Sequence, residues 1–270
     1  MSFVADRIGI MAAMPEELQA LIDSMPDAEV VRRAGRDFWI GHLQGRAVVA
    51  VLSRIGKVAA ALTTTLLVAE FGVCAVIFTG VAGGLGAAVR VGDVVVADAL
   101  MQHDMDASPL FPKYELPGQG ITRLHPERSL TRRVRDRVAE VLDVSSLAAG
   151  GALSQVHLDA LGLHAPRVHM GLIVSGDQFV SSAADCDTLR HHLPDVLAVE
   201  MEGAAVAQVC HDFEVPYVIL RTISDRADDT AHVDFPRFIS TVASRYSQAM
   251  VLGLLDRHAD QHDGDVFGEA

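Results

Sequence analysis

Short apolar runs alternate along the chain with segments in which apolar residues recur at helical spacing. Runs rich in Val, Ile and Phe predict buried strands, and the helical spacing predicts amphipathic helices. The predicted strands are residues 8–13, 38–43, 47–52, 74–79, 93–100, 168–174, 197–199 and 215–223. The predicted helices are a helix from about residue 15 and residues 56–70, 129–142, 185–192, 202–212 and 234–258.

This alternation predicts an α/β fold, a single-domain three-layer α/β/α architecture with a central mixed, mostly parallel sheet. No repeat, low-complexity tract or second domain interrupts the pattern. We expect residues 1–258 to form the domain and residues 259–270 to form an acidic, disordered tail. Residues 71–89 are uncharged over a length that could span a bilayer, but their five glycines favour a buried strand followed by a glycine turn.

Charge and cysteine content narrow the range of partners. Lys and Arg number 22 against 35 Asp and Glu, which gives a net charge of −13 and disfavours nucleic acid and membrane surfaces as partners. The three cysteines are an odd number without a CxxC pair, which fits neither a disulfide framework nor a structural zinc site. The amino terminus has no long signal-peptide core, so we expect a cytoplasmic location.

Carboxylates stand where several predicted strands end. Glu17 follows the first strand, Glu200 and Glu202 follow the strand at 197–199, and Asp225 follows the last strand, close to Arg221. Taken singly, Glu17 is also explained by the dipole of the following helix, and Asp225 by an N-cap. Ligands in such sheets bind beyond the carboxyl ends of strands. Carboxylates at several strand ends therefore favour a single crevice in which they carry out general acid–base chemistry.

Two other patterns are less specific. The string TGVAGG at residues 79–84 follows a predicted buried strand but is neither GxGxxG nor a Walker sequence. Its glycines either let the chain turn sharply or let backbone amides approach a ligand, and both interpretations stay open. His103, Asp104, Asp106 and the pair His191-His192 lack the spacing of a helical metal site, so we expect no metal and no cofactor.

The sequence resembles the nucleoside phosphorylase and nucleosidase superfamily, and within it the bacterial methylthioadenosine/S-adenosylhomocysteine nucleosidases. The matching strings run in family order over nearly the whole chain. They are IGIMAAMPEEL (8–18), SRIGKVAAA (53–61), TGVAGGL (79–85), VGDVVVAD (91–98), GLIVSGDQFV (171–180), AVEMEGAAVAQVC (198–210) and RTISDRAD (221–228).

The resemblance implies roles for the carboxylates. Glu17 matches the general base for an attacking water, with Arg221 helping to hold that site, and Asp225 matches the acid that protonates adenine N7. Glu202 matches the carboxylate that binds the ribose hydroxyls, while Glu200 either shares the sugar site or is a structural partner. The implied substrate-binding residues within the subunit are Met14, Ile55, Val81, Ala82, Gly83, Phe179, Val180, Glu200, Met201, Glu202 and Ser224.

A segment rich in proline and aromatic residues, 107–126, also has a counterpart in the family. The resemblance implies that Phe111, Tyr114 and Pro117 close over the 5′ substituent in the adjacent subunit of a homodimer, whereas the alternative is an incidental surface loop. Two residues depart from the family pattern. Val81 stands where many relatives carry a serine, and Arg54 replaces a small residue with a cation that could recruit an anion.

The expected activity is hydrolysis of 5′-methylthioadenosine or S-adenosylhomocysteine to adenine and a thioribose product. A phosphorylase on the same fold is the nearest alternative, but Glu16 and Glu17 would repel phosphate. A non-catalytic adenosine-binding protein would have no need for both Glu17 and Asp225. The sequence does not rank methylthioadenosine, S-adenosylhomocysteine, 5′-deoxyadenosine and aminodeoxyfutalosine, because these nucleosides differ only in their 5′ arms.

Overall fold

A computed structural model describes residues 7–143, 166–227, 235, 238–256 and 266–267 of the chain. Its strands are β1 (Ile8–Ala12), β2 (Glu29–Arg33), β3 (Arg36–Leu43), β4 (Arg46–Leu52), β5 (Ala75–Phe78), β6 (Val81–Gly84), β7 (Val94–Gln102), β8 (Val168–Ser175), β9 (Val196–Glu200) and β10 (Tyr217–Asp225). Its helices are α1 (Pro15–Asp23), α2 (Lys57–Ala69), α3 (Arg128–Val141), α6 (Ala183–His192), α7 (Gly203–Asp212) and α9 (Ser244–Leu255), with a π-helical turn η1 (Ile239–Ala243) before α9.

The ten strands form one sheet in the order β2-β3-β4-β1-β5-β10-β6-β9-β8-β7, and β10 pairs additionally with β7. This extra pairing closes β10, β6, β9, β8 and β7 into a ring. The neighbouring pairs from β4 through β1, β5 and β10 to β6 are parallel, as are β9–β8 and β8–β7. The pairs β2–β3, β3–β4, β6–β9 and β10–β7 are antiparallel. The predicted mixed, mostly parallel sheet is confirmed.

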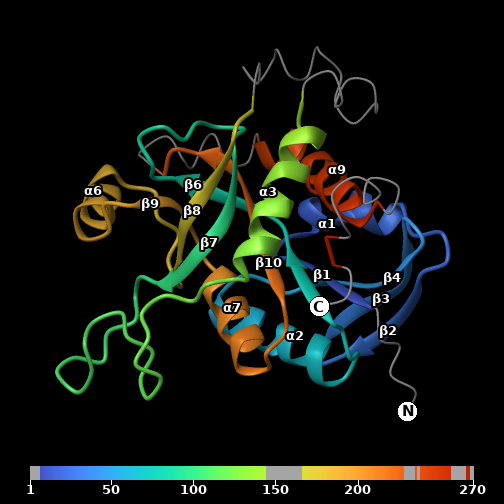
Figure 1. Ribbon diagram of the computed structural model, residues 1–270, viewed down its shortest axis with the longest axis horizontal. Helices are drawn as coiled ribbons and strands as arrows, with labels where there is room; N and C mark the ends of the chain where they lie inside the picture. Colours follow the sequence, from blue (N-terminus) through green and yellow to red (C-terminus); the bar gives the residue numbers. More distant parts are fainter. Residues whose placement is uncertain (1–6, 144–165, 228–234, 236–237, 257–265, 268–270) are drawn as a thin grey trace.

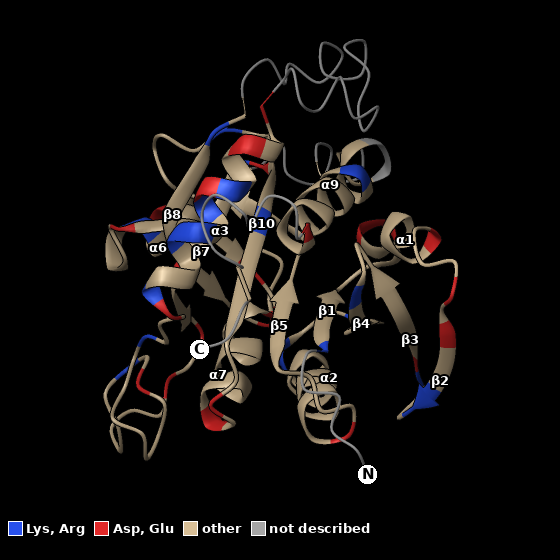
Figure 2. Cartoon of the chain, turned by 45° about the vertical axis from the view of Figure 1, so that its right-hand side comes forward, with Lys and Arg blue, Asp and Glu red and all other residues tan. Residues whose placement is uncertain are grey.

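Helices cover both faces of the sheet, as Figure 1 shows. Helices α1, α3 and α9 pack together over one apolar cluster, and α2 packs against α7 over a second one. Arginines concentrate on α3 (Figure 2), whose buried face carries Leu130, Val134 and Val138. A helix that is apolar along one face and charged along the other is typical of a protein surface. The three-layer, single-domain architecture agrees with the prediction.

Two predictions about the strands were wrong. Residues 81–84, predicted as part of a glycine turn, form β6 in the middle of the sheet. The edge strand β2 was not predicted, because its sequence EVVRR is exposed at four of five positions and shows no strict alternation. The last strand also extends through Ser224 to Asp225, so Asp225 ends β10 and is not a helix N-cap.

The carboxyl-terminal segment is described only in part. Of the predicted helix 234–258, η1 and α9 are described, together with a few flanking residues, and the rest lies outside the described residues. Of the predicted tail, Val266 is described and is 6 % exposed, packed in the same cluster as α3 and α9. The boundary between domain and tail remains a prediction. Within the described part of the chain, no helix has both the length and the apolar character needed to cross a membrane.

Candidate active site

Glu17 lies in the first turn of α1, directly after β1. Its Oε2 accepts hydrogen bonds from the N–H groups of Ala13 and Met14, both at 2.9 Å, and its Oε1 accepts one from Val81 at 3.1 Å. Burial raises the pKa of this carboxyl group, while the Arg221 charge and the three N–H donors oppose the rise. Glu17 therefore caps α1, as the simpler interpretation held, but it also binds a strand 64 residues away.

Arg221 lies in the middle of β10 and is 1 % exposed. Its Nε and Nη2 donate to Glu200 Oε2 at 3.2 and 2.7 Å, and its Nη1 donates to the carbonyls of Phe78 and Leu220. The guanidinium carbon stands 4.0 Å from the centre of the Phe78 ring. The direct partner of Arg221 is thus Glu200, and Arg221 acts on Glu17 through its charge.

Glu200, at the end of β9, is surrounded by donors. Besides Arg221, it accepts hydrogen bonds from the N–H groups of Glu202 and Gly203 and from the hydroxyl of Ser175. Ser175 in turn accepts from the next N–H of α7 at 2.7 Å. A carboxylate has about four acceptor sites, and the five donors around Glu200 occupy them, which favours the structural partner over the sugar-binding alternative left open by the sequence.

The glycines around β6 bring these groups together. A Cβ atom at Gly80 would lie 2.9 Å from Glu17 Oε1 and 3.3 Å from Arg221 Nη1, and one at Gly83 would lie 3.2 Å from Asp225 Oδ1. Asp225 is the register partner of Gly83. The glycine string therefore does not form the sharp turn considered from the sequence. It makes room for carboxylates of the protein to approach the backbone.

Asp225 is 2 % exposed, and two donors among the described residues hold its carboxyl group. The Ser224 hydroxyl donates to Oδ2 and the Ala227 N–H donates to Oδ1, both at 2.7 Å. The same Ser224 hydroxyl lies 3.4 Å from the carbonyl oxygen of Ala82 on β6. The orientation of the Asp225 carboxyl is therefore fixed by groups of the same subunit.

Glu202 occupies the N-cap position of α7 and is 6 % exposed. Its Oε1 accepts a hydrogen bond from the N–H of Gly56 at 2.8 Å. Burial and, after it, the nearby negative charge of Glu200 raise the pKa of Glu202 to about 8, against the opposing charge of Arg221. Burial therefore favours the protonated form of this side chain.

The apolar residues expected around a ligand differ in exposure. Val180 is buried, whereas Met14, Val81 and Met201 are half-buried. Phe179 is 46 % exposed and meets Phe235 edge to face at 5.5 Å, and Ile55 is 56 % exposed. Val81 contributes its backbone N–H to Glu17, so the donor does not depend on the serine that it replaces.

The segment between β7 and α3 presents a different residue from those predicted. Phe111 and Tyr114 are half-buried, and Tyr114 packs against a cluster that includes residues of β7 and β8. Pro117 is exposed, and Leu110 is 83 % exposed. Leu110 was missed because a single leucine in the short string PLFP (109–112) carries no periodic signal.

Arg54, considered from the sequence as a cation that recruits an anion, is bound within the chain. Its Nη2 donates to the carbonyl of Gly35 at 2.6 Å, in the turn between β2 and β3. Its backbone φ of +69° lies in the left-handed region, as does that of Gly56, two residues later, at φ +98°. Its contact with an anion stays a prediction.

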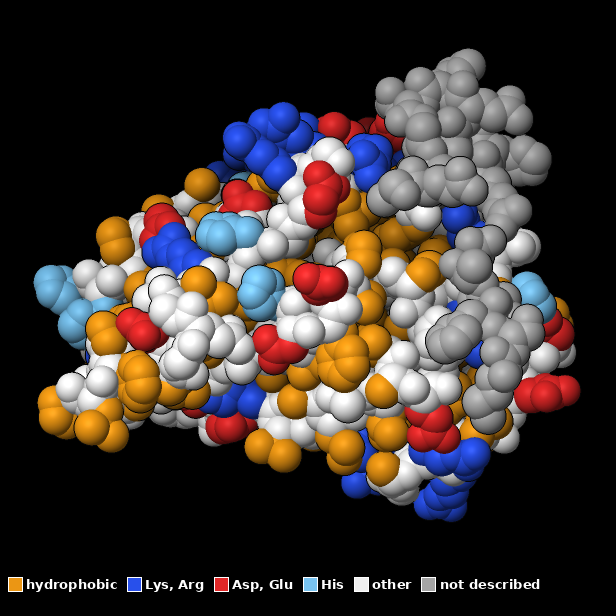
Figure 3. Space-filling view, turned by 60° about the horizontal axis from the view of Figure 1, so that its bottom comes forward, with side chains coloured by type: hydrophobic (Ala, Val, Ile, Leu, Met, Phe, Trp, Pro, Cys, Tyr) orange, Lys and Arg blue, Asp and Glu red, His pale blue; other side chains and the backbone are white. Residues whose placement is uncertain are grey.

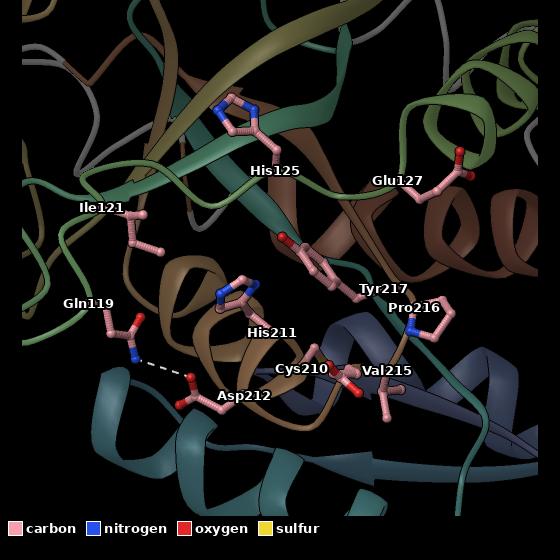
Figure 4. Close-up of a pocket in the computed structure, with 11 residues that line it drawn as sticks. Gln119, Ile121, His125, Glu127, Cys210, His211, Asp212, Val215, Pro216 and Tyr217 are labelled. Carbon is pink, nitrogen blue, oxygen red and sulfur yellow. Dashed lines mark hydrogen bonds between the residues drawn. The ribbon is translucent and has the colours of Figure 1, made fainter.

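A cavity of about 670 Å³ lies elsewhere, where β10 begins and α7 ends. Figure 4 shows Tyr217, His211 and Cys210 among its lining residues. Asp225 is at the other end of β10, and none of the predicted site residues lines this cavity. Among the described residues, no group of three or more His, Cys, Asp or Glu side chains could hold a metal ion.

The polar corner formed by Glu17, Glu200, Glu202, Arg221 and Asp225 is the candidate site. Burial raises the pKa of two of its carboxyl groups, Glu17 and Glu202, which makes each of them a stronger base than an exposed glutamate. Its arginine is already bound by Glu200 and does not offer a vacant fork to a phosphate.

Comparison with known proteins places this geometry in a family. The model of the phosphorylase superfamily matches residues 7–256. The structure is similar to the 5′-methylthioadenosine/S-adenosylhomocysteine nucleosidase of Neisseria meningitidis in complex with methylthio-immucillin-A, with a TM-score of 0.80 and 34% identity over 93% of this chain and 99% of that chain. The family resemblance seen in the sequence is confirmed.

Two further solved structures bear on substrate. The corresponding nucleosidase of Colwellia psychrerythraea 34H, in complex with adenine, has a TM-score of 0.80 and 34% identity, covering 94% of this chain and 96% of that chain. The futalosine hydrolase of Helicobacter pylori has a TM-score of 0.77 and 32% identity, covering 94% of this chain and 99% of that chain. These neighbours are hydrolases named for different nucleosides, 5′-methylthioadenosine and S-adenosylhomocysteine in the first case and futalosine in the second.

Proposed function

The chain belongs to the phosphorylase superfamily, and from this premise we propose that it is a nucleosidase that hydrolyses 5′-methylthioadenosine and S-adenosylhomocysteine. The observation that carries the proposal is the pair of buried carboxyl groups, Glu17 and Asp225, which lie against β6 at Val81 and at Gly83 respectively. Hydrolysis of an N-glycosidic bond needs a base for water and an acid for the leaving group, and two separately held carboxyl groups supply both.

In the proposed reaction, water attacks C1′ of the ribose while the bond from C1′ to adenine N9 breaks. Glu17 takes a proton from the water, and its raised pKa makes it a stronger base than an exposed glutamate. Asp225 gives a proton to N7, so that adenine leaves as a neutral base. The three N–H donors around Glu17 keep its carboxylate oriented toward the attacking water.

The sugar is assigned to Glu202, with Met14 and Met201 packed around it. A carboxyl group with a pKa of about 8 can both accept from and donate to ribose hydroxyls. The positive charge that develops on the ribosyl group is stabilised by the surrounding carboxylates. Phe179, with nearly half of its surface exposed, offers a face on which adenine can stack.

Hydrolysis is favoured over phosphorolysis by the charges at this corner. Phosphate binding needs cationic donors, and the Arg221 guanidinium beside Glu17 already donates twice to Glu200. The solved neighbours named above are hydrolases, which supports the same choice. The futalosine hydrolase makes aminodeoxyfutalosine the second substrate to test.

We also propose that the active unit is a homodimer in which each subunit closes the 5′ pocket of the other. Val58 and Leu62, four residues apart on α2, form an exposed apolar stripe, and Ile55, which precedes the helix, is exposed as well. Leu110 exposes a further apolar side chain, and hydrophobic side chains are spread over the face seen in Figure 3. An isologous dimer would cover such a face on both subunits.

The test is adenine release by the full chain from 5′-methylthioadenosine, S-adenosylhomocysteine, 5′-deoxyadenosine and aminodeoxyfutalosine, each with and without phosphate. We expect release from the first two at a rate that does not depend on phosphate. Formation of a sugar 1-phosphate would replace hydrolysis by phosphorolysis. Release from aminodeoxyfutalosine alone would move the substrate to that nucleoside, and tight binding without release would contradict catalysis.

A further inference from the structure

A closed ring of hydrogen bonds joins three segments that are far apart in the sequence. The N–H of Lys57 donates to Asp177 Oδ1 at 2.8 Å, and the N–H of Asp177 donates to Asp104 Oδ2 at 2.9 Å. Lys57 Nζ closes the ring by donating to Asp104 Oδ1 at 2.6 Å. The three residues, here called the Lys57 ring, follow β4, β7 and β8.

The Lys57 ring is shielded and further braced. The side chains of Lys57 and Asp104 are 15% and 33% exposed, so their ion pair is screened less than a surface pair. Burial alone would raise the pKa of Asp104, but the Lys57 ammonium and the Asp177 N–H hold it below its usual range. Lys57 Nζ also donates to Gln102, which donates to Gln208 on α7 at 2.8 Å.

The Lys57 ring adjoins Gly56, which binds Glu202, the carboxyl group proposed to bind the sugar. Gly56, directly before Lys57, gives its N–H to Glu202. Its φ of +98° is reached easily only by glycine, and a Cβ there would lie 3.2 Å from Asp177 Oδ1. Two successive N–H groups at the start of α2 thus bind two carboxylates from separate loops, Glu202 and Asp177.

We infer that Lys57 and Asp104 are positioning residues that set the Gly56 N–H against Glu202 and thereby control recognition of the ribose hydroxyls. This inference rests on the proposed function, in which Glu202 binds those hydroxyls. Neither residue touches the reacting atoms. Their effect passes through the backbone of residues 56 and 57, which the ring ties to the segments after β7 and β8.

The first test compares 5′-methylthioadenosine with its 2′-deoxy analogue as substrates. In Lys57→Met and Asp104→Ala, we expect the preference in kcat/KM for the ribonucleoside to fall about tenfold, the size of one lost hydrogen bond. In a Glu202→Gln background, the same changes should alter this preference by less than about twofold, because coupled residues are not additive. An unchanged preference, or equal effects in both backgrounds, overturns the inference.

The matched control is Arg123→Met. Arg123 forms an ion pair of similar length, 2.6 Å, with Asp195, which precedes β9 and so lies at the end of that strand opposite Glu200. This variant should leave the ribose preference unchanged. A general loss of folding would instead appear as a lowered melting temperature in the ring variants, and it would reduce turnover of both substrates equally.

Amide hydrogen exchange tests the Lys57 ring independently of enzyme activity. In Asp104→Ala, exchange should become faster both at residues 54–58 and at residues 176–180, although Asp104 is distant from both in sequence. Unchanged protection in these two segments overturns the inference, whatever the activity. If the wild-type chain released no adenine while exchange responded as expected, the proposed function would fail and the ring would stand as a structural coupling.

Discussion

The polar corner of the site and its apolar rim are completed in different ways. Glu17, Glu200 and Arg221 are 2 %, 7 % and 1 % exposed, and each is bound by groups of the same chain. At the proposed rim, Ile55 and Phe179 are 56 % and 46 % exposed, and Leu110, proposed to complete the rim of the partner subunit, is 83 % exposed. The corner is organised before any ligand arrives, whereas the rim still exposes apolar surface that a ligand or a second subunit would cover.

This difference assigns chemistry and selectivity to separate parts of the molecule. Burying three charged groups is costly unless each is paired, and the closed network around Glu200 provides that pairing. Fixed dipoles and charges then need not reorganise during the reaction. The rim, by contrast, can vary with the 5′ arm without disturbing the acid and the base. Substitutions in the two regions should therefore affect different kinetic parameters.

The largest effect should come from removing the acid of the corner. Asp225→Asn retains the shape of the side chain but supplies no carboxyl proton for N7, so adenine release should fall by about 10² to 10⁴. The measurement is kcat for 5′-methylthioadenosine. Asp98→Asn, at an exposed position of β7, is the control and should retain activity. Near wild-type turnover in Asp225→Asn would sink the assignment of this residue as the acid.

Removing the base should separate catalysis from binding. In Glu17→Gln, we expect hydrolysis to fall by about 10² or more while adenine still binds, because Glu17 is proposed to act on water and not on the base. Titration with adenine measures binding, and the exposed neighbour Glu16→Gln is the control. Binding lost in proportion to activity would instead identify Glu17 as a structural or ligand-binding residue.

The rim should respond in KM. Leu110→Ala, and more weakly the half-buried Phe111→Ala and Tyr114→Ala, should raise KM for 5′-methylthioadenosine about tenfold and that for adenosine much less, because a 5′ hydroxyl gains little from an apolar pocket. Val30→Ala, at an exposed apolar position of the edge strand β2, is the control. Equal effects on both substrates would remove the rim from 5′ recognition.

Hybrid dimers extend the same test to the partner subunit. When Leu110→Ala and Glu17→Gln chains are refolded together, each hybrid should contain one site with an intact base and an intact borrowed loop, so activity should recover. Light scattering checks that dimers have formed. A monomer, or verified hybrids without recovery, would remove the shared-site model and leave the assignments of Glu17 and Asp225 unaffected.

The sequence predicted the polar corner better than the fold around it. Glu17, Arg221 and Asp225 stand beside apolar runs, and the structure brings all three to β6. Glu200 ends β9, which runs antiparallel to β6 within the mixed sheet that was predicted. Strand β6 itself could not be predicted, because four residues with two glycines have weak strand propensity. The strand is formed by its pairing with β10 and β9.

Contacts between distant segments were also beyond the sequence. Nothing near Lys57 indicates that its partners are Asp104 and Asp177, because a charged residue after an apolar run is usually solvated. Likewise, the choice of Glu200 over Glu17 as the partner of Arg221 depends on side-chain geometry within a fully buried strand. Such contacts are decided by packing, whereas the sequence supplies residue types and their order.

The last prediction concerns the pH dependence of the melting temperature and not the reaction rate. Glu202 has a pKa of about 8 in the folded chain and an ordinary value of 4.5, so between these pH values the folded state binds more protons than the unfolded state. Its contribution to stability is therefore present below pH 4.5 and is lost as the pH rises toward 8, at up to about 1.4 kcal/mol per pH unit. Glu202→Gln cannot ionise, so its melting temperature should fall less than that of the wild type between pH 5 and pH 8, by about 2–4 °C for each kcal/mol. Glu16→Gln, which changes an exposed carboxylate, should keep the wild-type slope. Parallel melting curves for Glu202→Gln and wild type would mean that Glu202 is ionised in the unliganded corner, and its negative charge would then be in place before the sugar binds.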